Sequence, residues 1–478
     1  MLIDLKRFIC TTICGVIAAF LIVLMGNIYA GILIGVFLVI FAWYVSKAKE
    51  NTYIVLFLIA FFAFLMGHVI VKELLHDDRA YYSVAIPQTV DNYTYIVLTI
   101  SLLSIFVGYE FAKIPIRGSH NGCVKEYNYR AIKRVEFLTK NLLYVSLACL
   151  IAVNAESIIY VQTVGYLSSY LSKTSVLPGF ISGIATMVPM IFALYLATIP
   201  EKQDAKWPII FYVIAMGMNL FAGKRYEAVS AVLLLVLYAS YRNKIDEDKW
   251  ITKKHVLFLI VMLPVAVIML TLMASWRAGS TDTDVGASLL IDFMSGVGNS
   301  SQLISYEKMY HSELASRNAL FSFGNVWRSL SGNAIAQFMG FSQSYGTQTV
   351  ENALYGHSLS AAIMYKINPR RMLEGGGLGS CYIAELMCDF SYFGVVLGNI
   401  VIGIIIQKLN RLDRGRFVTN FLMIFMATTL FRLPRDSFDY FFYQFLGIKN
   451  IILLVLVYLT YKKKESFDEA PISYEEKT

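Results

Sequence analysis

Residues 28–45 read IYAGILIGVFLVIFAWYV, a run of eighteen residues without one charged side chain. A helix that crosses the roughly 30 Å hydrocarbon core of a bilayer needs about 20 apolar residues. The whole chain has this character, because 57% of its 478 residues are hydrophobic and only 15% are charged. A soluble domain of this length could not bury so much apolar surface. The sequence therefore predicts an all-α polytopic membrane protein.

Apolar runs of spanning length recur along the chain and predict twelve transmembrane helices. The first run is long enough to span and no small-residue cleavage site follows it, so it is interpreted as a true span and not as a cleaved signal peptide. The predicted spans are residues 8–26, 28–45, 53–71, 93–112, 141–159, 180–199, 207–222, 226–241, 256–274, 382–406, 417–430 and 441–461.

The distribution of Lys and Arg predicts the orientation, since cytoplasmic segments carry an excess of both. If the N-terminus is cytoplasmic, 26 of the 41 basic residues lie on the inner side. An even number of spans returns the C-terminus to the cytoplasm as well. The predicted organisation is spans one to nine in residues 1–275, a large extracytoplasmic loop with short amphipathic helices in 276–381, spans ten to twelve in 382–464 and a cytoplasmic polar tail in 465–478.

The net charge of +8 is attributed to this membrane orientation, because the chain has no basic soluble domain that would bind a nucleic acid. The cysteines have neither the spacing of a disulfide framework nor that of a metal site with histidines. They are interpreted as small apolar residues, and no metal and no cofactor is predicted. They are Cys10, Cys14, Cys123, Cys149, Cys381 and Cys388.

Several cations fall on the predicted outer side, against the general bias. They are Lys224, Arg225, Arg277, Arg432 and Arg435. Any single one is equally well explained as a side chain that reaches the membrane surface and pairs with Glu227, Asp436 or Asp439. The whole set favours an anionic ligand, because an arginine fork suits phosphate or pyrophosphate.

A glycine-rich turn precedes the tenth predicted span. Residues 374–385 read EGGGLGSCYIAE, and glycines let the backbone approach a ligand closely. Ser380 is predicted to cap the helix that follows. Glu385 and Asp389 are four residues apart and share one helical face, so these carboxylates near the membrane surface are functional candidates. This glycine-rich stretch does not indicate nucleotide binding, since no strand precedes it.

These motifs resemble those of the Wzy-type O-antigen and capsule repeat-unit polymerases. The resemblance lies in AEL at 384–386, DF at 389–390, FGVVLG at 393–398, GKR at 223–225 and RLPR at 432–435. A large outer loop late in a chain of about twelve helices also matches that family. The related O-antigen ligases usually carry a histidine in the large loop close to the next helix. Here Glu385 stands in the helix and His357 lies well before the turn, which favours a polymerase.

The resemblance implies a GT-C-like fold and a glycosyl transfer at the outer face of the bacterial cytoplasmic membrane. The donor and the acceptor would be oligosaccharide repeat units linked to undecaprenyl pyrophosphate, with a chain-length regulator and a flippase as further partners. No nucleotide sugar and no metal is implied. The five outward cations would stabilise the departing pyrophosphate. Glu385 is preferred over His357 as the base, and Glu374, Asp389 and Asp436 are further candidates.

Two other functions remain open from the residues. A polysaccharide flippase or exporter would also use cations in a membrane cavity, but it predicts repeated halves and short loops. An O-antigen ligase is the nearest alternative enzyme.

Overall fold

A computed structural model describes most of the chain. It describes residues 5–24, 26–76, 84–114, 128–165, 175–222, 225–252, 294–317, 319–332, 345–414 and 416–463, with the isolated residues 171, 254, 255, 257, 291 and 338. All regular elements within these residues are helical, which confirms the all-α prediction.

Long apolar helices make up the first half of the chain. Asn27 shows how one of them begins, because its side-chain oxygen accepts the N–H groups of Tyr29 and Ala30 and so caps the helix from Ile28. The elements are α1 (Leu5–Leu24), α2 (Ile28–Val45), α3 (Thr52–Phe61), the π-helical η1 (Phe62–Met66), α4 (Gly67–Leu74), α5 (Gln88–Phe111), α6 (Tyr129–Val164), α7 (Gly179–Ala185), α8 (Val188–Ala197), α9 (Lys202–Phe221) and α10 (Arg225–Ile245).

The described part of the 276–381 segment folds into short helices, and the chain then returns to long ones. The short helices are η3 (Gly298–Ser301), α13 (Gln302–Ala315), η4 (Phe321–Phe323), α14 (Gly324–Ser331), α16 (Val350–Tyr355), α17 (Leu359–Ile367) and α18 (Pro369–Leu373). The remaining elements are α19 (Tyr382–Lys408), α20 (Phe417–Leu430), η5 (Leu433–Arg435), α21 (Tyr440–Tyr443), η6 (Gln444–Leu446) and α22 (Ile448–Lys462).

Eight stretches of the described residues are helices long and apolar enough to cross a membrane. They coincide with the predicted spans that begin at residues 28, 53, 93, 141, 180, 226, 382 and 417. The predicted last span corresponds to Tyr440–Leu446 and Ile448–Lys462, which meet at a bend of 71°. The predicted spans 8–26 and 207–222 are the helices α1 and α9, which fall outside the eight, and the span 256–274 lies almost wholly outside the described residues. The total of twelve stays a prediction.

Two glycines allow α5 and α19 to pack with their backbones almost in contact. A Cβ atom on Gly108 would lie 2.1 Å from the carbonyl oxygen of Ile400, and one on Gly403 would lie 2.3 Å from that of Ile105. Small residues permit such close approach between membrane helices. The helix α19 is kinked at Ser391, which has a φ of 57° and a ψ of −154°. Its first turns, before the kink, carry Glu385 and Asp389.

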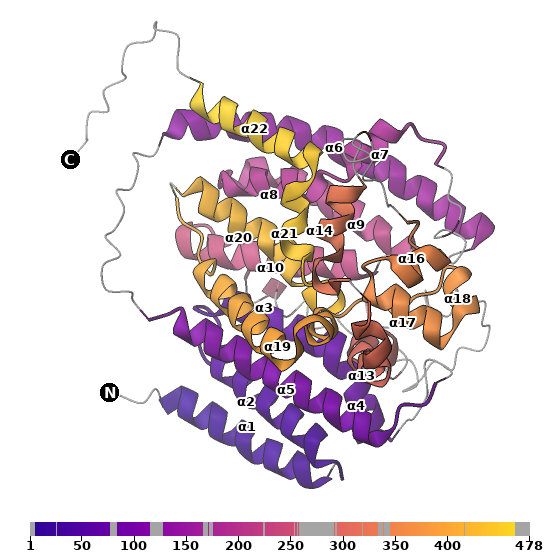
Figure 1. Cartoon of the computed structure of the whole chain (residues 1–478). Coiled ribbons are helices and arrows are strands. Elements are labelled where there is room, and N and C mark those ends of the chain that lie inside the picture. The colour runs from indigo at the N-terminus through magenta and orange to yellow at the C-terminus, as the bar shows by residue number, and fades with distance from the viewer. Residues whose placement is uncertain are drawn as a thin grey trace, which may run out of the picture.

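The segments predicted to be cytoplasmic meet at one end of the bundle. Asn410 donates a hydrogen bond to the carbonyl oxygen of Glu50 at 2.6 Å, and Arg414 pairs with Asp246 at 2.9 Å. Both termini of the described chain and these loops lie on the left in Figure 1, while α16, α17 and α18 lie on the right. We call the end formed by residues 47–51, 110–113 and 407–414 the basic end.

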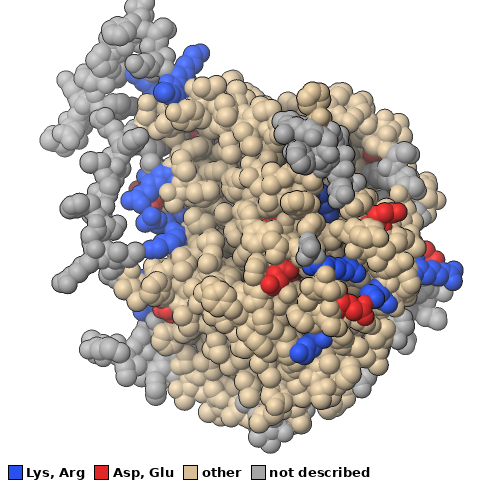
Figure 2. All heavy atoms as spheres, in the orientation of Figure 1, with Lys and Arg blue, Asp and Glu red and all other residues tan. Residues whose placement is uncertain are grey.

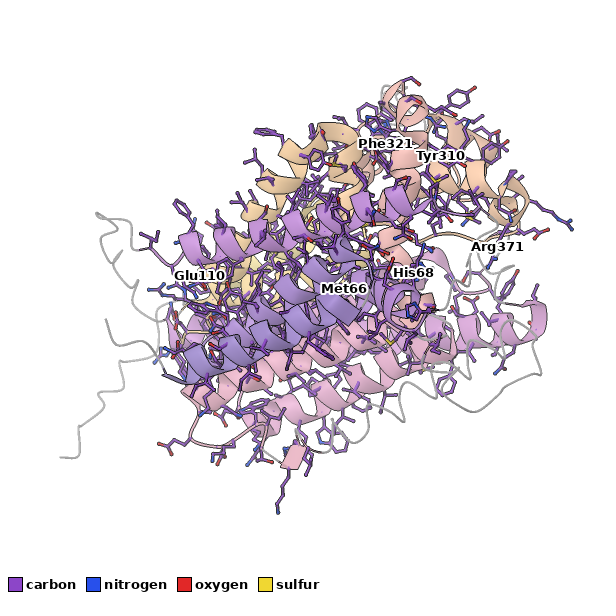
Figure 3. The ribbon with its side chains drawn as sticks, turned by 90° about the horizontal axis from the view of Figure 1, so that it is seen from below. Met66, His68, Glu110, Tyr310, Phe321 and Arg371 are labelled. Atoms are coloured by element: carbon purple, nitrogen blue, oxygen red, sulfur yellow. The ribbon has the colours of Figure 1, made fainter. Side chains whose placement is uncertain are left out.

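The two ends differ in surface charge. In Figure 2, Lys and Arg side chains line the left edge, whereas the right half carries charges of both signs beyond a mostly uncharged band. Figure 3 places Glu110 at the basic end and Tyr310 and Arg371 at the opposite end. An uncharged band between two charged ends is what a helical bundle in a bilayer requires.

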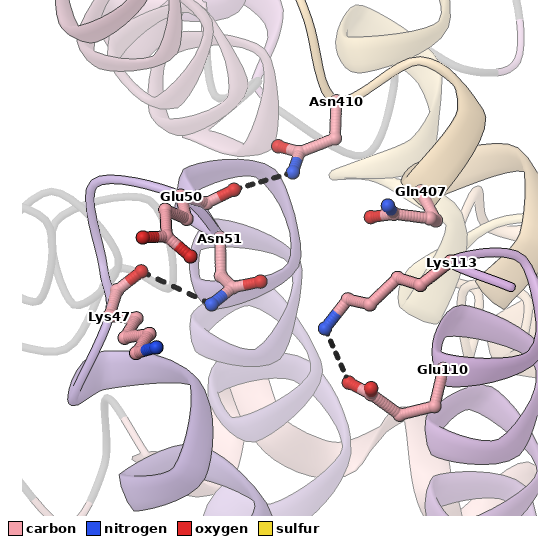
Figure 4. A pocket seen from close by; sticks show the side chains of 7 residues that line it. All are labelled: Lys47, Glu50, Asn51, Glu110, Lys113, Gln407 and Asn410. Atoms are coloured by element: carbon pink, nitrogen blue, oxygen red, sulfur yellow. Dashed lines mark hydrogen bonds and ion pairs between the residues drawn. The ribbon is translucent and has the colours of Figure 1, made fainter. Parts of the chain in front are cut away.

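The basic end holds a polar cavity of about 360 Å³. Its side chains come from three of the predicted cytoplasmic segments, and Lys113 pairs with Glu110 at 2.6 Å (Figure 4). The lining residues are Lys47, Glu50, Asn51, Glu110, Lys113, Gln407 and Asn410.

Candidate functional site

A second polar cavity, of about 290 Å³, lies between the 276–381 segment, the glycine-rich turn and the residues that follow η5. Arg328 and Asp436 contribute its charged side chains, and amides and hydroxyls contribute most of the rest. Such groups both donate and accept hydrogen bonds, which suits the hydroxyls of a sugar. Its polar lining is Asn325, Arg328, Thr347, Gln348, Asn352, His357, Ser358, Ser360, Ser380, Asp436 and Ser437. We call it the sugar cavity, after the class of ligand that this lining suits.

The glycine-rich turn forms one wall of the sugar cavity with its backbone. Gly375 and Gly379 have φ values of 95° and 75°, which glycine adopts without strain. The predicted capping role of Ser380 is wrong. The cap of α19 is Cys381, without a side-chain bond, and the Ser380 hydroxyl instead donates a hydrogen bond to Glu385.

Glu385 is buried behind this turn, with 2% of its surface exposed. Its Oε1 accepts the Ser380 hydroxyl at 2.6 Å, and its Oε2 accepts the backbone N–H of Phe438 at 2.9 Å. Both oxygens are therefore engaged, and Glu385 is not among the residues that line the sugar cavity. In this arrangement it ties the glycine-rich turn to the segment after η5.

Two aspartates accept similar hydrogen bonds from distant segments. Asp389 accepts the backbone N–H groups of Phe321 and Ser322 at 3.1 and 2.7 Å. Asp439 accepts the Asn325 side-chain amide and the Val326 N–H, both at 2.8 Å. Each aspartate satisfies donors near the start of α14, which would otherwise lack partners at a helix beginning. Together they hold this part of the 276–381 segment over α19 and α21.

Arg432 and Arg435 stand beside the sugar cavity. Arg432 pairs with Asp436 at 3.1 Å, and its guanidinium lies 4.4 Å from the ring centre of Tyr440. Arg435 donates to the carbonyl oxygens of Val297 and Gly296 at 2.8 and 3.5 Å.

Asp436 is the acidic group of the sugar cavity. Burial raises the pKa of its carboxyl, while Arg432 opposes that shift. The neighbouring Arg435 also adjoins the cavity wall, since a Cβ atom on Gly379 would lie 3.7 Å from its Nε. The sequence-predicted residues Arg432, Arg435 and Asp436 are thus brought together at this wall.

The remaining predicted site residues are placed differently. Lys224 and Arg277 lie outside the described residues, and Arg225 is the first residue of α10, with a side chain that the structure does not describe. Glu374 is largely exposed and pairs with Arg370 at 2.9 Å, four residues earlier. This ion pair is of the surface type, which contributes little.

His357 lines the sugar cavity. Its ring centre lies 5.1 Å from that of Trp327, and its Nδ1 has no hydrogen-bond partner among the described residues. Partial burial lowers the pKa of His357, against the influence of the Leu320 backbone and Asp389. The imidazole is therefore neutral at neutral pH and able to accept a proton.

Sequence reasoning did not single out Arg328 or the bridging role of Asp439. Arg328 lies in the segment 276–381, for which the sequence predicts short amphipathic helices, but an amphipathic pattern does not indicate a cavity. Asp439 had been considered only as a partner for a cation, whereas it binds the start of α14, more than a hundred residues earlier.

These features define an integral membrane protein of helical type with a polar cavity suited to sugars at one end. A model of the family described as O-antigen polysaccharide polymerase Wzy matches residues 6–464, nearly the whole chain. The chain belongs to this family, which confirms the resemblance drawn from its motifs. By its description, the family is one of polymerases. No curated protein and no solved structure matches the chain.

Proposed function

We propose that this polymerase joins oligosaccharide repeat units linked to undecaprenyl pyrophosphate, at the outer face of the bacterial cytoplasmic membrane. The product is an O-antigen, a capsule or a related surface polysaccharide. The observation that carries the proposal is the sugar cavity, which lies at the end of the bundle opposite the basic end and has two arginines beside it.

The transfer requires one bond to break and one to form. The hydroxyl oxygen of the acceptor repeat unit attacks the anomeric carbon of the donor glycan, and the bond from that carbon to the pyrophosphate oxygen breaks. The hydroxyl proton passes to a base, and undecaprenyl pyrophosphate leaves with the electron pair. Arg432 and Arg435, beside the cavity, are proposed to stabilise that anion as its charge develops. Lys224, Arg225 and Arg277 are proposed to complete the anion site.

We assign the base to His357. It lines the sugar cavity, its Nδ1 is without a partner among the described residues, and it is neutral at neutral pH. Glu385, the residue preferred from the sequence, has both oxygens engaged and is proposed as a positioning residue. The chemistry then uses the sugar cavity, the base at its wall and the arginines behind it.

The test uses the purified protein in liposomes with lipid-linked repeat units, and measures polymer formed per time. His357→Gln should lower the rate by about 10²–10⁴-fold, the usual effect of losing a positioned base. In the parent protein, the rate should fall only once the pH drops below the ordinary histidine pKa, because the base must be neutral and burial lowers the pKa of His357. Glu313→Gln is the matched control, since that exposed residue pairs with Lys366 on the surface.

Retention of the parent rate and pH profile in His357→Gln would remove the base assignment. Absence of any polymer from the parent protein with these substrates would contradict the proposed function itself. A chain-length regulator and a flippase, if they act with this protein, would change the polymer length and the substrate supply but not these two outcomes.

A further inference from the structure

A cluster of three metal-ligating side chains lies away from the sugar cavity, where α13 packs on α19. Glu307 and His311 are four residues apart in α13, so they share one face of that helix. Cys388 reaches the same place from α19. One ligand atom from each residue, a carboxylate oxygen, an imidazole nitrogen and the thiol sulfur, lies within 4.8 Å of the other two. None of these side chains has a part in the proposed transfer reaction.

One carboxylate oxygen of Glu307 lacks a hydrogen-bond partner among the described residues. Its side chain is only 1% exposed, and its Oε1 contacts Nδ1 of His311 at 2.5 Å. Its Oε2 is buried and has no hydrogen-bond partner among the described residues. A buried carboxylate oxygen without a partner is costly. A cation bound here would satisfy that oxygen.

We propose that Glu307, His311 and Cys388 bind a zinc ion that fastens α13 to α19. A set of one nitrogen, one sulfur and one oxygen ligand suits zinc, whereas magnesium and calcium take oxygen ligands. The Glu307 carboxylate and the Cys388 thiolate balance the two positive charges of the ion. Water occupies the fourth position, on the side where His311 is half exposed.

The geometry needs only a small adjustment. Tetrahedral zinc places its ligand atoms about 3.3–3.6 Å apart, so the half-exposed imidazole of His311 has to move away from Glu307 by about 1 Å, while the sulfur of Cys388 already lies within 4.8 Å of both other ligand atoms. On binding, the thiol proton of Cys388 passes to solvent, and His311 binds as the neutral tautomer through Nδ1. Zinc affinity should therefore fall as the pH is lowered.

The zinc ion would stabilise the part of the 276–381 segment that lies over α19, beside the sugar cavity. Cys388 precedes Asp389, which accepts hydrogen bonds from the backbone of residues 321 and 322 in η4. A zinc ion bound to Cys388, on the same turn of α19, adds a second connection, which joins α19 to α13. The ion is thus expected to support the structure and not to take part in glycosyl transfer.

The first experiment measures zinc bound per chain after dialysis of the purified full-length protein against buffered zinc. The parent should retain about one equivalent, and His311→Ala and Cys388→Ser should lose it. His255→Ala is the matched control, because this exposed histidine lies after α10, far along the chain from the cluster. His311 is half exposed, so its replacement leaves the packing of α13 intact.

The second experiment follows the rate at which maleimide labels each cysteine, with peptides quantified by mass spectrometry. Zinc at about ten times its Kd fills roughly nine-tenths of the sites and should slow the labelling of Cys388 about tenfold. Labelling of Cys149, on α6, should not change.

Equal zinc content in His311→Ala and His255→Ala, or labelling of Cys388 that zinc does not slow, would overturn the proposal. Glu307 and His311 would then form a hydrogen-bonded pair only. Neither readout depends on polymerase activity, so the outcome is separate from that of the proposed function.

Discussion

At the scale of single residues, the carboxylates around the sugar cavity act as anchors. Glu385, Asp389 and Asp439 each accept two hydrogen bonds from donors in other segments. A buried carboxylate with satisfied oxygens fixes backbone positions, because breaking either bond leaves a buried donor without a partner. His357 lines the cavity, and its Nδ1 has no hydrogen-bond partner among the described residues.

Replacement of Glu385 separates anchoring from catalysis. Glu385→Leu removes the acceptor of both the Ser380 hydroxyl and the Phe438 N–H, so we expect a loss of about 1–3 kcal/mol of stability, seen as a lower Tm, with a modest loss of polymer. In Glu385→Gln, the amide oxygen accepts the Phe438 N–H and the NH₂ donates to the Ser380 hydroxyl, so both the Tm and the polymer yield should stay near those of the parent. If Glu385 is instead the base, the Tm should hold while the rate falls about 10²–10⁴-fold.

Arg435→Lys tests the shape of the proposed anion site. Lysine keeps the charge but loses the planar fork that reaches the carbonyl oxygens of Gly296 and Val297 and adjoins Gly379. Polymer length or yield should fall while the protein remains in the membrane, as judged by gel analysis of the glycan and immunoblotting. Full activity of Arg435→Ala would exclude a role in binding pyrophosphate.

At the scale of elements, the contact between α5 and α19 places the sugar cavity. The helix α19 carries Glu385, Cys388 and Asp389 in its first turns, and its later turns lie against α5 through Gly108 and Gly403. The contact is made by backbone, so it cannot adapt by a change of rotamer. The position of the cavity wall therefore depends on glycines far from the cavity.

Gly403→Ala should separate the two helices. The added Cβ would meet the Ile105 carbonyl oxygen at 2.3 Å, and overpacking of this kind costs about 1–3 kcal/mol. We expect a lower Tm and less polymer. Gly217→Ala, in α9, is the matched control, since its Cβ meets nothing within 4 Å. That change should be neutral or stabilising by up to about 1 kcal/mol, and equal Tm values for both variants would contradict the argument.

At the scale of the whole molecule, the two polar cavities lie at opposite ends of the bundle. The basic end collects the segments that the charge bias assigns to the cytoplasm, and the sugar cavity lies at the other end. A substrate carried on a lipid in the outer leaflet would reach only the sugar cavity. Orientation therefore decides whether the proposed chemistry takes place outside.

Reporter fusions test the orientation. Fusions near Lys125, Lys249 and Arg414 should report a cytoplasmic location and a fusion near Gln348 an outer one, because basic segments are retained inside. Gln348 lines the sugar cavity, so a cytoplasmic result there would contradict the orientation and the proposed mechanism together.

The sequence by itself determined the class of protein, because a bilayer demands long apolar runs and these are visible without knowledge of contacts. It also identified the motifs of the family, since Glu385, Asp389, Arg432 and Arg435 stand in short local patterns. Only the tertiary structure decided what those residues touch. Glu385 meets Phe438, and Asp389 meets Ser322, across more than fifty residues of chain.

Such contacts depend on how α19, α21 and the 276–381 segment pack together, and no local pattern encodes that packing. For the same reason the sequence indicated Glu385 as the base, whereas we propose His357 once the contacts of both residues are known. The association of Glu307 and His311 with Cys388 is a third case. It joins two helices distant in sequence, and only their packing brings the three ligand atoms within reach of one ion.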